Sequence, residues 1–472
     1  GHIRNVYGTL LADLSIRQDL SALTKGLAAE ASVSFDNIGG MNETTNKEYR
    51  YMNSNASITS DGTLVTTPAI YGTDSETLGH TQPFERLMLR SDFQAKVDYN
   101  RTFGKHQVGG ALIYDMQSVV KNGRNNSQKN QSVLVNATYT YDNRYSLNAV
   151  FNRSGSAYLP DGDKYSNYPA VSAAWIVSNE AFMEKVTPIN LFKIRASYGL
   201  SGWDGNLSHE LWRQSYGSGG AGYNFGVNAG GQSGGSEGDL PVIGLVAEKS
   251  QKATFGFDLA AFDNRLNATV EGFYEKRSDI LVSGANSTSG IIGITVGQVN
   301  EGIYKYKGLD ASLSWNDKIG DFHYGIGASM SYLNTEVVNV NQAYQEYDYL
   351  YTKGNRIGQM YGLEAIGFFN SQQEINNSPQ QTFSDVAPGD VKYKDQNGDN
   401  RIDEKDVVKM FGSSVPRFYF GFNLNFSYKR VELSADFQGM TGVTVSLLNS
   451  PLYSPLVSNG NISNTFLNEE IS

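Results

Sequence analysis

Long segments of the chain alternate strictly between apolar and polar residues. In 418–428, the residues on one face are Phe418, Phe420, Phe422, Leu424, Phe426 and Tyr428, and those on the other are Tyr419, Gly421, Asn423, Asn425 and Ser427. Successive side chains of a β-strand point to opposite faces, so this period predicts a strand with one apolar and one polar face. The same alternation starts at Leu27, Phe93, Val133, Tyr145, Phe255, Leu266, Leu309 and Phe322.

The length of these segments favours a membrane protein over a soluble all-β protein. Soluble strands usually have about 5–6 residues, whereas a tilted strand that crosses a membrane needs about 9–11. The apolar faces carry no charged residue, and aromatic residues stand near the segment ends, as Phe322 and Tyr332 do. Outer-membrane barrels share both features. We therefore predict an all-β protein, a transmembrane antiparallel β-barrel surrounded by outer-membrane lipid.

Short and long connections alternate between the predicted strands. The short ones are 21–26, 102–106, 142–144, 263–265, 317–321 and 429–430, with 178–190 as a longer exception, and the long ones are 37–86, 116–131, 153–167, 200–250, 277–303 and 335–416. Outer-membrane barrels alternate short periplasmic turns with longer extracellular loops, so we expect roughly fourteen strands here. An open sheet edge is not viable in lipid, and we expect residues 1–472 to be an incomplete barrel that other strands close.

Composition agrees with many strands and excludes several classes of protein. Gly (50 residues), Tyr (29) and Phe (23) are abundant, Pro (11) is scarce, and 18% of residues are charged, below the roughly 25% of soluble domains. The net charge of −10 argues against a nucleic-acid partner, because phosphate binding needs clustered Lys and Arg. The chain has no Cys, which excludes thiolate metal sites. No apolar run reaches about 18 residues, which excludes a transmembrane helix.

An acidic segment, DQNGDNRIDEKD, resembles an EF-hand calcium loop. Its oxygen donors at positions 1, 3, 5, 7, 9 and 12 are Asp395, Asn397, Asp399, the Arg401 carbonyl, Asp403 and Asp406. Two features depart from the motif, because Asn400 replaces the turn glycine and Asp406 is shorter than the usual Glu. We predict a structural calcium site that orders the loop 335–416; the alternative is an Asx-rich turn.

Aromatic side chains in two long loops are candidates for substrate contact at the extracellular mouth. They are Trp203 and Trp212 in 200–250, and Tyr344, Tyr347, Tyr349 and Tyr351 in 335–416. Aromatic rings stack on sugar faces, but the same rings can pack loops on each other or on a partner protein. Both interpretations stay open.

Nothing in the sequence favours catalysis. The G-x-G-x-x-G pattern of 217–222 and the G-x-S-x-G pattern of 231–235 lie in a Gly/Ser-rich loop without the strand-turn-helix context that those motifs need. The five histidines show no metal-ligand spacing. Carboxylates on polar faces are Asp258, Glu271, Asp310 and Asp436, and a polar lumen face is the default of a barrel. We expect a protein that is not an enzyme.

The segments that define the strands resemble the SusC/RagA-like family of TonB-dependent transporters from Bacteroidetes. The resemblance is carried by YPAVSAAWIVSNEAFM (168–183), KIRASYGLSG (193–202), EKSQKATFGFDLAAFDNRLNATVEGFYEKRSDIL (248–281), IGQMYGLEAIGFF (357–369), PGDVKYKDQNGDNRID (388–403) and VPRFYFGFNLNFSYKRVELSADFQG (415–439). It implies a barrel of about 22 strands, of which this chain holds about strands 6 to 19. The family's N-terminal plug, which contacts TonB, and the closing strands have no counterpart in these residues.

The resemblance also implies a function and partners. It implies outer-membrane import of oligosaccharides or, in some relatives, peptides, with a SusD-like surface lipoprotein as a lid and TonB acting through the plug. Related sequences carry a similar acidic motif. The alternative within the superfamily is a siderophore or vitamin receptor without a lipoprotein lid.

Overall fold

The computed structural model describes residues 2–58, 63–81, 84–121, 127–224, 231–284, 291, 293–294 and 296–446. Contacts divide the chain into two compact units. One comprises Gly1–Thr138, Val150–Asn167 and Leu207–Glu210, and the other comprises Tyr139–Ala149, Tyr168–Asn206 and Leu211–Ser472. Among the described residues, no helix is both long and apolar enough to span a membrane.

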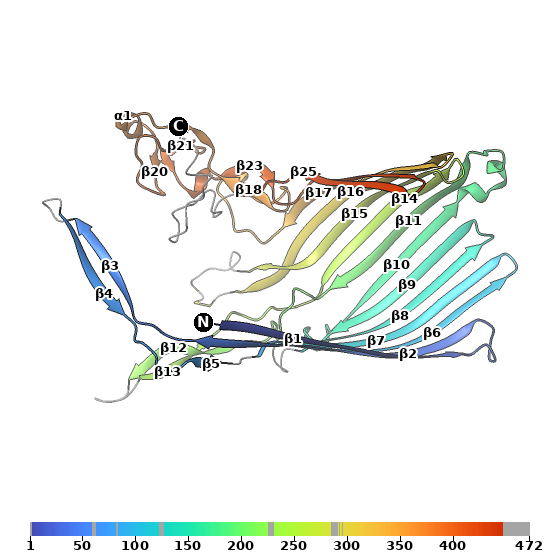
Figure 1. Cartoon of the computed structure of the whole chain (residues 1–472), viewed down its shortest axis with the longest axis horizontal. Coiled ribbons are helices and arrows are strands. Elements are labelled where there is room, and N and C mark those ends of the chain that lie inside the picture. The colour runs from blue at the N-terminus through green and yellow to red at the C-terminus, as the bar shows by residue number, and fades with distance from the viewer. Residues whose placement is uncertain are drawn as a thin grey trace. The chain divides into compact units, whose positions relative to one another are not determined.

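One antiparallel sheet carries most of the described residues, with the strand order β1-β2-β6-β7-β8-β9-β10-β11-β14-β15-β16-β17-β24-β25 (Figure 1). The first seven strands of this path are β1 (His2–Asp19), β2 (Leu27–Asn46), β6 (Phe84–Phe103), β7 (His106–Lys121), β8 (Ser127–Tyr141), β9 (Tyr145–Ser156) and β10 (Tyr165–Ile176). The other seven are β11 (Ile189–Trp203), β14 (Glu248–Ala261), β15 (Leu266–Ser283), β16 (Gln298–Ile319), β17 (Phe322–Asn339), β24 (Phe418–Tyr428) and β25 (Val431–Thr441). The predicted antiparallel barrel fold and its fourteen-strand path are confirmed for the described part of the chain.

The exposed side chains of the strands are the apolar ones, the reverse of a soluble protein. Along β9, Leu147 (48% exposed) and Phe151 (46%) are exposed, whereas Asn148 and Asn152, which directly follow them, are half-buried. Strands β8 and β10 repeat the alternation. Rows of large apolar side chains on a protein surface require an apolar environment, because exposing them to water is unfavourable in free energy. The odd-numbered residues of β9 therefore form a membrane face, and the even-numbered residues a polar face.

The short turns are formed by residues that tolerate left-handed backbone. Asp142 (φ 51) and Asn143 (φ 52) connect β8 to β9, and both residue types adopt this conformation more readily than most. Gly26 (φ 89), just before β2, is required for a second reason, because a Cβ there would lie 2.0 Å from the Asn100 carbonyl oxygen. These turns lie where the sequence predicted them.

The strands are longer than the sequence predicted at the end with the long connections. Residues 116–131 were expected to be a loop, but β7 continues to Lys121 and β8 starts at Ser127. Likewise β2 extends to Asn46 and β17 to Asn339. The predicted boundaries were wrong because they followed the apolar alternation, which ends with the lipid layer. Backbone hydrogen bonding between strands continues beyond it without needing an apolar face.

Several long connections have structure of their own. In the first unit they contain the hairpin β3 (Tyr51–Ile58) and β4 (Leu64–Tyr71), and β5 (Gly79–Thr81), which pairs with β2. After β10 come the 3-10 turns η2 (Val177–Asn179) and η3 (Ala181–Met183), and after β11 the hairpin β12 (Tyr216–Asn224) and β13 (Gly231–Glu237). The G-x-G-x-x-G and G-x-S-x-G patterns lie within this last hairpin, not in a strand-turn-helix.

The connection between β17 and β24 is the most structured. It contains η6 (Asp348–Leu350), β18 (Gln359–Gly362), β19 (Ala365–Phe368), α1 (Gln372–Asn376), β20 (Gln380–Gln381), β21 (Val391–Tyr393), β22 (Arg401–Ile402), η7 (Glu404–Asp406) and β23 (Val408–Ser413). Its small core includes Phe369 and Ile402, which are 2% and 0% exposed. Arg356 joins its first part to its last part, just before β24, by donating to the Val415 carbonyl at 2.9 Å. We call residues 340–417 the folded loop.

Candidate functional site

The polar face of the second unit carries a network of paired charges. Lys193 and Arg195 of β11 face Asp258 of β14, at 3.1 Å and 3.5 Å from its Oδ2. Arg195 also forms an ion pair with Glu271 of β15. The register explains the arrangement, because Lys193 lies opposite Asp258 and Arg195 opposite Gly256, whose next neighbour across the sheet is Glu271. With no side chain at Gly256, the guanidinium reaches across one strand.

A cavity of about 280 Å³ lies beside this network. Its lining combines small and polar side chains, including Ser146, Asn148, Ser172 and Thr254, with Lys193 and Arg195. The Ser197 and Thr254 hydroxyl groups lie 2.8 Å apart and share a hydrogen bond. The surface thus offers hydroxyl, amide and cationic donors to a polar solute. Asp258 and Glu271, the two carboxylates of the network, are each paired with a basic side chain. Carboxylates held in this way suit a structural role better than proton transfer.

Only half of this network was predicted from the sequence. The carboxylates Asp258 and Glu271 were predicted on polar faces, but their cations, Lys193 and Arg195, were not. The signal was present, since Lys193, Arg195 and Ser197 occupy alternate positions of a predicted strand. The other two polar-face carboxylates lie along the same sheet, with Asp310 opposite Glu271 and Asp436 opposite Asn423.

The polar face of the first unit is organised in the same way. The Arg17 guanidinium donates to Glu30 Oε2 at 3.0 Å and to Asp98 Oδ2 at 3.1 Å. Lys96 lies 3.4 Å from the other oxygen of Asp98, a residue that is 8% exposed. Each unit therefore presents a polar wall in which buried charges have partners.

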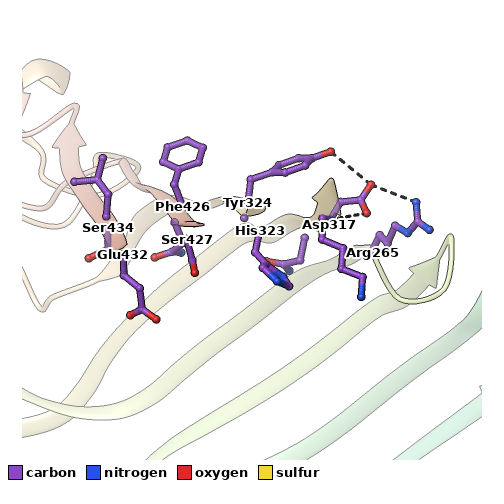
Figure 2. A pocket seen from close by; sticks show the side chains of 13 residues that line it. Arg265, Asp317, His323, Tyr324, Phe426, Ser427, Glu432 and Ser434 are labelled. Carbon is purple, nitrogen blue, oxygen red and sulfur yellow. Dashed lines mark hydrogen bonds and ion pairs between the residues drawn. The ribbon is translucent and has the colours of Figure 1, made fainter. Parts of the chain in front are cut away.

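A second cavity, of about 930 Å³, lies at the short-turn end of β16, β17, β24 and β25. Figure 2 shows Tyr324 and Phe426 on one side of the sheet and His323 and Glu432 on the other. On the first side, Arg265 Nη1 and the Tyr324 hydroxyl donate to Asp317 Oδ2 at 3.2 Å and 3.5 Å. The opposite, polar side offers the Lys318 amine, the His323 imidazole and the Glu432 carboxylate at the short-turn end of the wall.

The acidic loop is held together by its own side chains. Asp395 accepts hydrogen bonds from the backbone of Gly398 at 2.6 Å and Asn400 at 2.9 Å. Asp406 is fully buried and accepts from the backbone of Gln396 at 2.7 Å and Asp403 at 2.9 Å. Asx-turns, the alternative that the sequence left open, are also present, because the Asp399 N–H donates to Asn397 Oδ1 at 3.1 Å and the Arg401 N–H donates to Asp399 Oδ1 at 2.9 Å.

The acidic loop carries the oxygen donors of the predicted calcium site. Among the described residues, no three or more His, Cys, Asp or Glu side chains are grouped so that they could hold a metal ion. Asn400, which replaces the turn glycine of the motif, adopts left-handed backbone (φ 63). Calcium binding at this loop stays a prediction.

The predicted aromatic residues fall into two groups. Tyr347 and Tyr349 stack on each other with ring centroids 5.4 Å apart, and Tyr349 donates to the Lys405 carbonyl at 2.8 Å. Burial and the nearby Asp406 carboxylate raise the pKa of Tyr349. The Tyr351 hydroxyl accepts from the Gln345 backbone at 3.0 Å. These three tyrosines pack the folded loop.

The remaining aromatic residues are placed differently. Tyr344 is 85% exposed, and Trp203, the last residue of β11, is 57% exposed. The ring of Trp212 is half-buried and lies 4.4 Å from the Arg213 guanidinium carbon. Tyr344 and Trp203 are therefore the rings with a free face for a ligand, and the structure does not bring them together with the tyrosine pair.

Comparison with known proteins agrees with this architecture. TonB-dependent receptor P26 from Formosa agariphila is 29% identical over 315 residues, which cover 64% of this chain and 31% of that protein. TonB-dependent receptor SusC from Bacteroides thetaiotaomicron is 20% identical over 352 residues, covering 70% and 32%. This chain spans about a third of the length of these curated relatives.

Solved structures share the fold. The structure of the RagAB peptide transporter matches with a TM-score of 0.68 and 14% identity, covering 93% of this chain and 48% of that chain. A family model described as TonB dependent receptor-like, beta-barrel matches residues 5–449. Because that match includes nearly every strand described above, the chain belongs to the TonB-dependent receptor β-barrel family of the bacterial outer membrane.

Proposed function

We propose that this chain forms wall and extracellular loops of an importer that carries oligosaccharides, or alternatively peptides, across the outer membrane. The observation that carries the proposal is the pairing of an apolar membrane face with a polar face rich in hydroxyl groups, amides and paired charges. Such a wall lets a polar solute pass beside hydrocarbon. SusC among the relatives supports a carbohydrate, and the RagAB fold supports a peptide as the second candidate.

We propose two protein partners for the complete receptor. TonB would supply energy through a plug domain, as the family name implies. A SusD-like lipoprotein would cover the extracellular mouth, where the folded loop and the rings of Tyr344 and Trp203 are available for contact. Both proposals rest on family membership and on the resemblance of the strand segments.

Deletion of the gene tests the import function. The deletion strain is grown on separate oligosaccharides, on peptides, and under iron limitation with siderophores or without vitamins. We expect a defect on one class of oligosaccharide or peptide, restored by the wild-type gene. A defect confined to siderophore or vitamin supply would favour the alternative receptor class. Normal growth under every condition would contradict import.

A calcium titration of the full-length receptor tests the acidic loop. Hard cations bind carboxylate oxygens, and an oxygen that accepts one backbone hydrogen bond keeps a second lone pair. At calcium of about 100 times Kd, we expect amide exchange in 395–406 to slow about 100-fold. The double variant Asp395→Asn/Asp399→Asn should lose the effect, and Asp385→Asn, an exposed control in the folded loop, should keep it. Exchange independent of calcium in the wild type would refute the site.

A further inference from the structure

The membrane face of the first unit contains a groove of about 610 Å³. Its side chains from the membrane-facing rows include Val33, Phe93, Met116, Gln131 and Tyr165. At Gly155 of β9, which also lines the groove, the Tyr165 ring packs directly against the backbone. A Cβ there would lie 2.5 Å from Cε1 of the Tyr165 ring, and the Gln131 amide donates to the Tyr165 hydroxyl.

The depth of the groove places it at the outer edge of the lipid layer. Phe93 lies ten residues along β6 from Phe103 at the short-turn end. Ten residues span about 33 Å of strand, or about 23 Å of depth at a tilt of about 45°. The apolar band of an outer-membrane barrel is about 25 Å tall. The groove therefore lies just inside the outer edge of the apolar band, next to the head groups of the outer leaflet.

The polar residues around the groove agree with this depth. On β8 the membrane-facing row changes from Val135 and Val133 to Gln131 and Lys129. Arg153 of β9 also lies on this face, donating to Asn167 Oδ1 at 3.3 Å. Basic side chains facing lipid cost about 2–4 kcal/mol at the midplane but only about 0–1 kcal/mol near the interface. Three polar residues together are tolerated only at the interface.

The charge around the groove is positive and only partly neutralised. Among the described residues, Lys129 and Arg153 have no carboxylate within ion-pair distance, and the Arg153 guanidinium carbon lies 5.6 Å from the Tyr165 ring. Lys164, also at the groove, forms an ion pair with Asp161, and Asp92, the carboxylate that lines the groove, forms one with Arg90 at 2.8 Å. In a chain of net charge −10, two basic groups without acidic partners beside an apolar groove call for an anionic amphiphile.

We propose that this groove binds a phosphorylated glycolipid of the outer leaflet. One acyl chain would lie in the groove against Val33, Phe93 and Met116, beside the Tyr165 ring. The anionic head group would contact Lys129 and Arg153. The proposal depends on the membrane face and not on what the receptor imports.

The proposal is tested by measuring the binding of lipid A, a diphosphorylated glycolipid, with native mass spectrometry. The sample is the full-length receptor, delipidated and kept in nonionic detergent. Each basic residue near an anionic lipid contributes roughly fivefold in affinity. Lys129→Gln/Arg153→Gln should therefore weaken binding about 25-fold. Gly155→Leu, whose side chain would displace the Tyr165 ring that lines the groove, should also weaken binding. Phosphatidylcholine and inorganic phosphate are the comparison ligands, and both should bind more weakly than lipid A.

Two matched substitutions on the membrane face of the second unit serve as controls. Gly272→Leu adds a side chain where a Cβ would meet only carbonyl oxygens 3.9 Å away, and Lys307→Gln removes an exposed lysine of β16. Both should bind lipid A as the wild type does. Equal affinity in the wild type, the charge variant and Gly155→Leu would overturn the proposal. So would equal affinity for phosphatidylcholine or for inorganic phosphate.

Discussion

At the scale of single residues, the charged side chains of the polar faces and of the folded loop form pairs. The two partners of a pair come from different strands or loop segments. Glu364 accepts hydrogen bonds from Gln396 at 2.8 Å and Lys394 at 3.2 Å, and these contacts lower its pKa below the ordinary value of 4.5. The pKa of Glu374 is lowered too, first by the Asn370 backbone and then by Lys392. Both residues lie in the folded loop, outside the membrane.

These lowered pKa values give the folded loop a pH dependence. A carboxylate with a depressed folded pKa binds fewer protons when folded, so its stabilisation is complete above the unfolded value and is lost as pH falls through the folded value. We expect amide exchange in 364–396, corrected for the intrinsic rate, to become faster below pH 4.5. Glu364→Gln should reduce this dependence, and Glu404→Gln, at an exposed position, should not. Protection unchanged between pH 7 and pH 3 would contradict the role of these carboxylates.

At the scale of the strand, alternation decides which substitutions are tolerated. Ala149 lies midway along β9 on the membrane face, and Asn148 beside it lies on the polar face. Arg facing hydrocarbon near the midplane costs about 2–4 kcal/mol. We expect Ala149→Arg to lower the free energy of unfolding of the full-length receptor in lipid vesicles by that amount. Asn148→Asp, which places a charge on the polar face beside Lys193 and Arg195, should change it by less than about 1 kcal/mol.

Denaturant titrations of both variants measure this difference. A cost that is the same at the two neighbouring positions would mean that β9 does not separate lipid from water. The comparison is internal to one strand, because the two residues share its depth and differ only in the side to which they point.

The strands also show how much of the fold can be predicted from the sequence. Period-2 alternation located the turn between Tyr141 and Tyr145 and the membrane face of β24. It failed at the outer ends, where β7 and β8 continue through a predicted loop. Intrinsic β-propensity depends strongly on context. At these outer ends, pairing with the neighbouring strand determines whether a residue is part of a strand. Alternation also assigned Lys193 and Arg195 to a face, but which carboxylates they meet depends on register between strands far apart in sequence.

At the scale of the whole molecule, the loops were predicted least well. The acidic motif predicted a metal site, and the sequence did not show that Asp395 and Asp406 accept hydrogen bonds from backbone amides of their own loop. Nor did it show that Tyr349, a candidate for substrate contact, stacks on Tyr347. A sequence gives the residue types in a loop, but whether a ring faces ligand or another loop depends on tertiary contacts that have no period.

The central claim is that one face of each strand borders hydrocarbon and the other borders water. Because this chain has no cysteine, single cysteines at 145 to 153 can carry spin labels in the lipid-reconstituted receptor. Their accessibility to oxygen, which dissolves in lipid, is compared with that to a water-soluble nickel chelate. We predict oxygen maxima at Leu147, Ala149 and Phe151 and nickel maxima at Asn148 and Asn152. Nickel accessibility without a two-residue period would contradict the account.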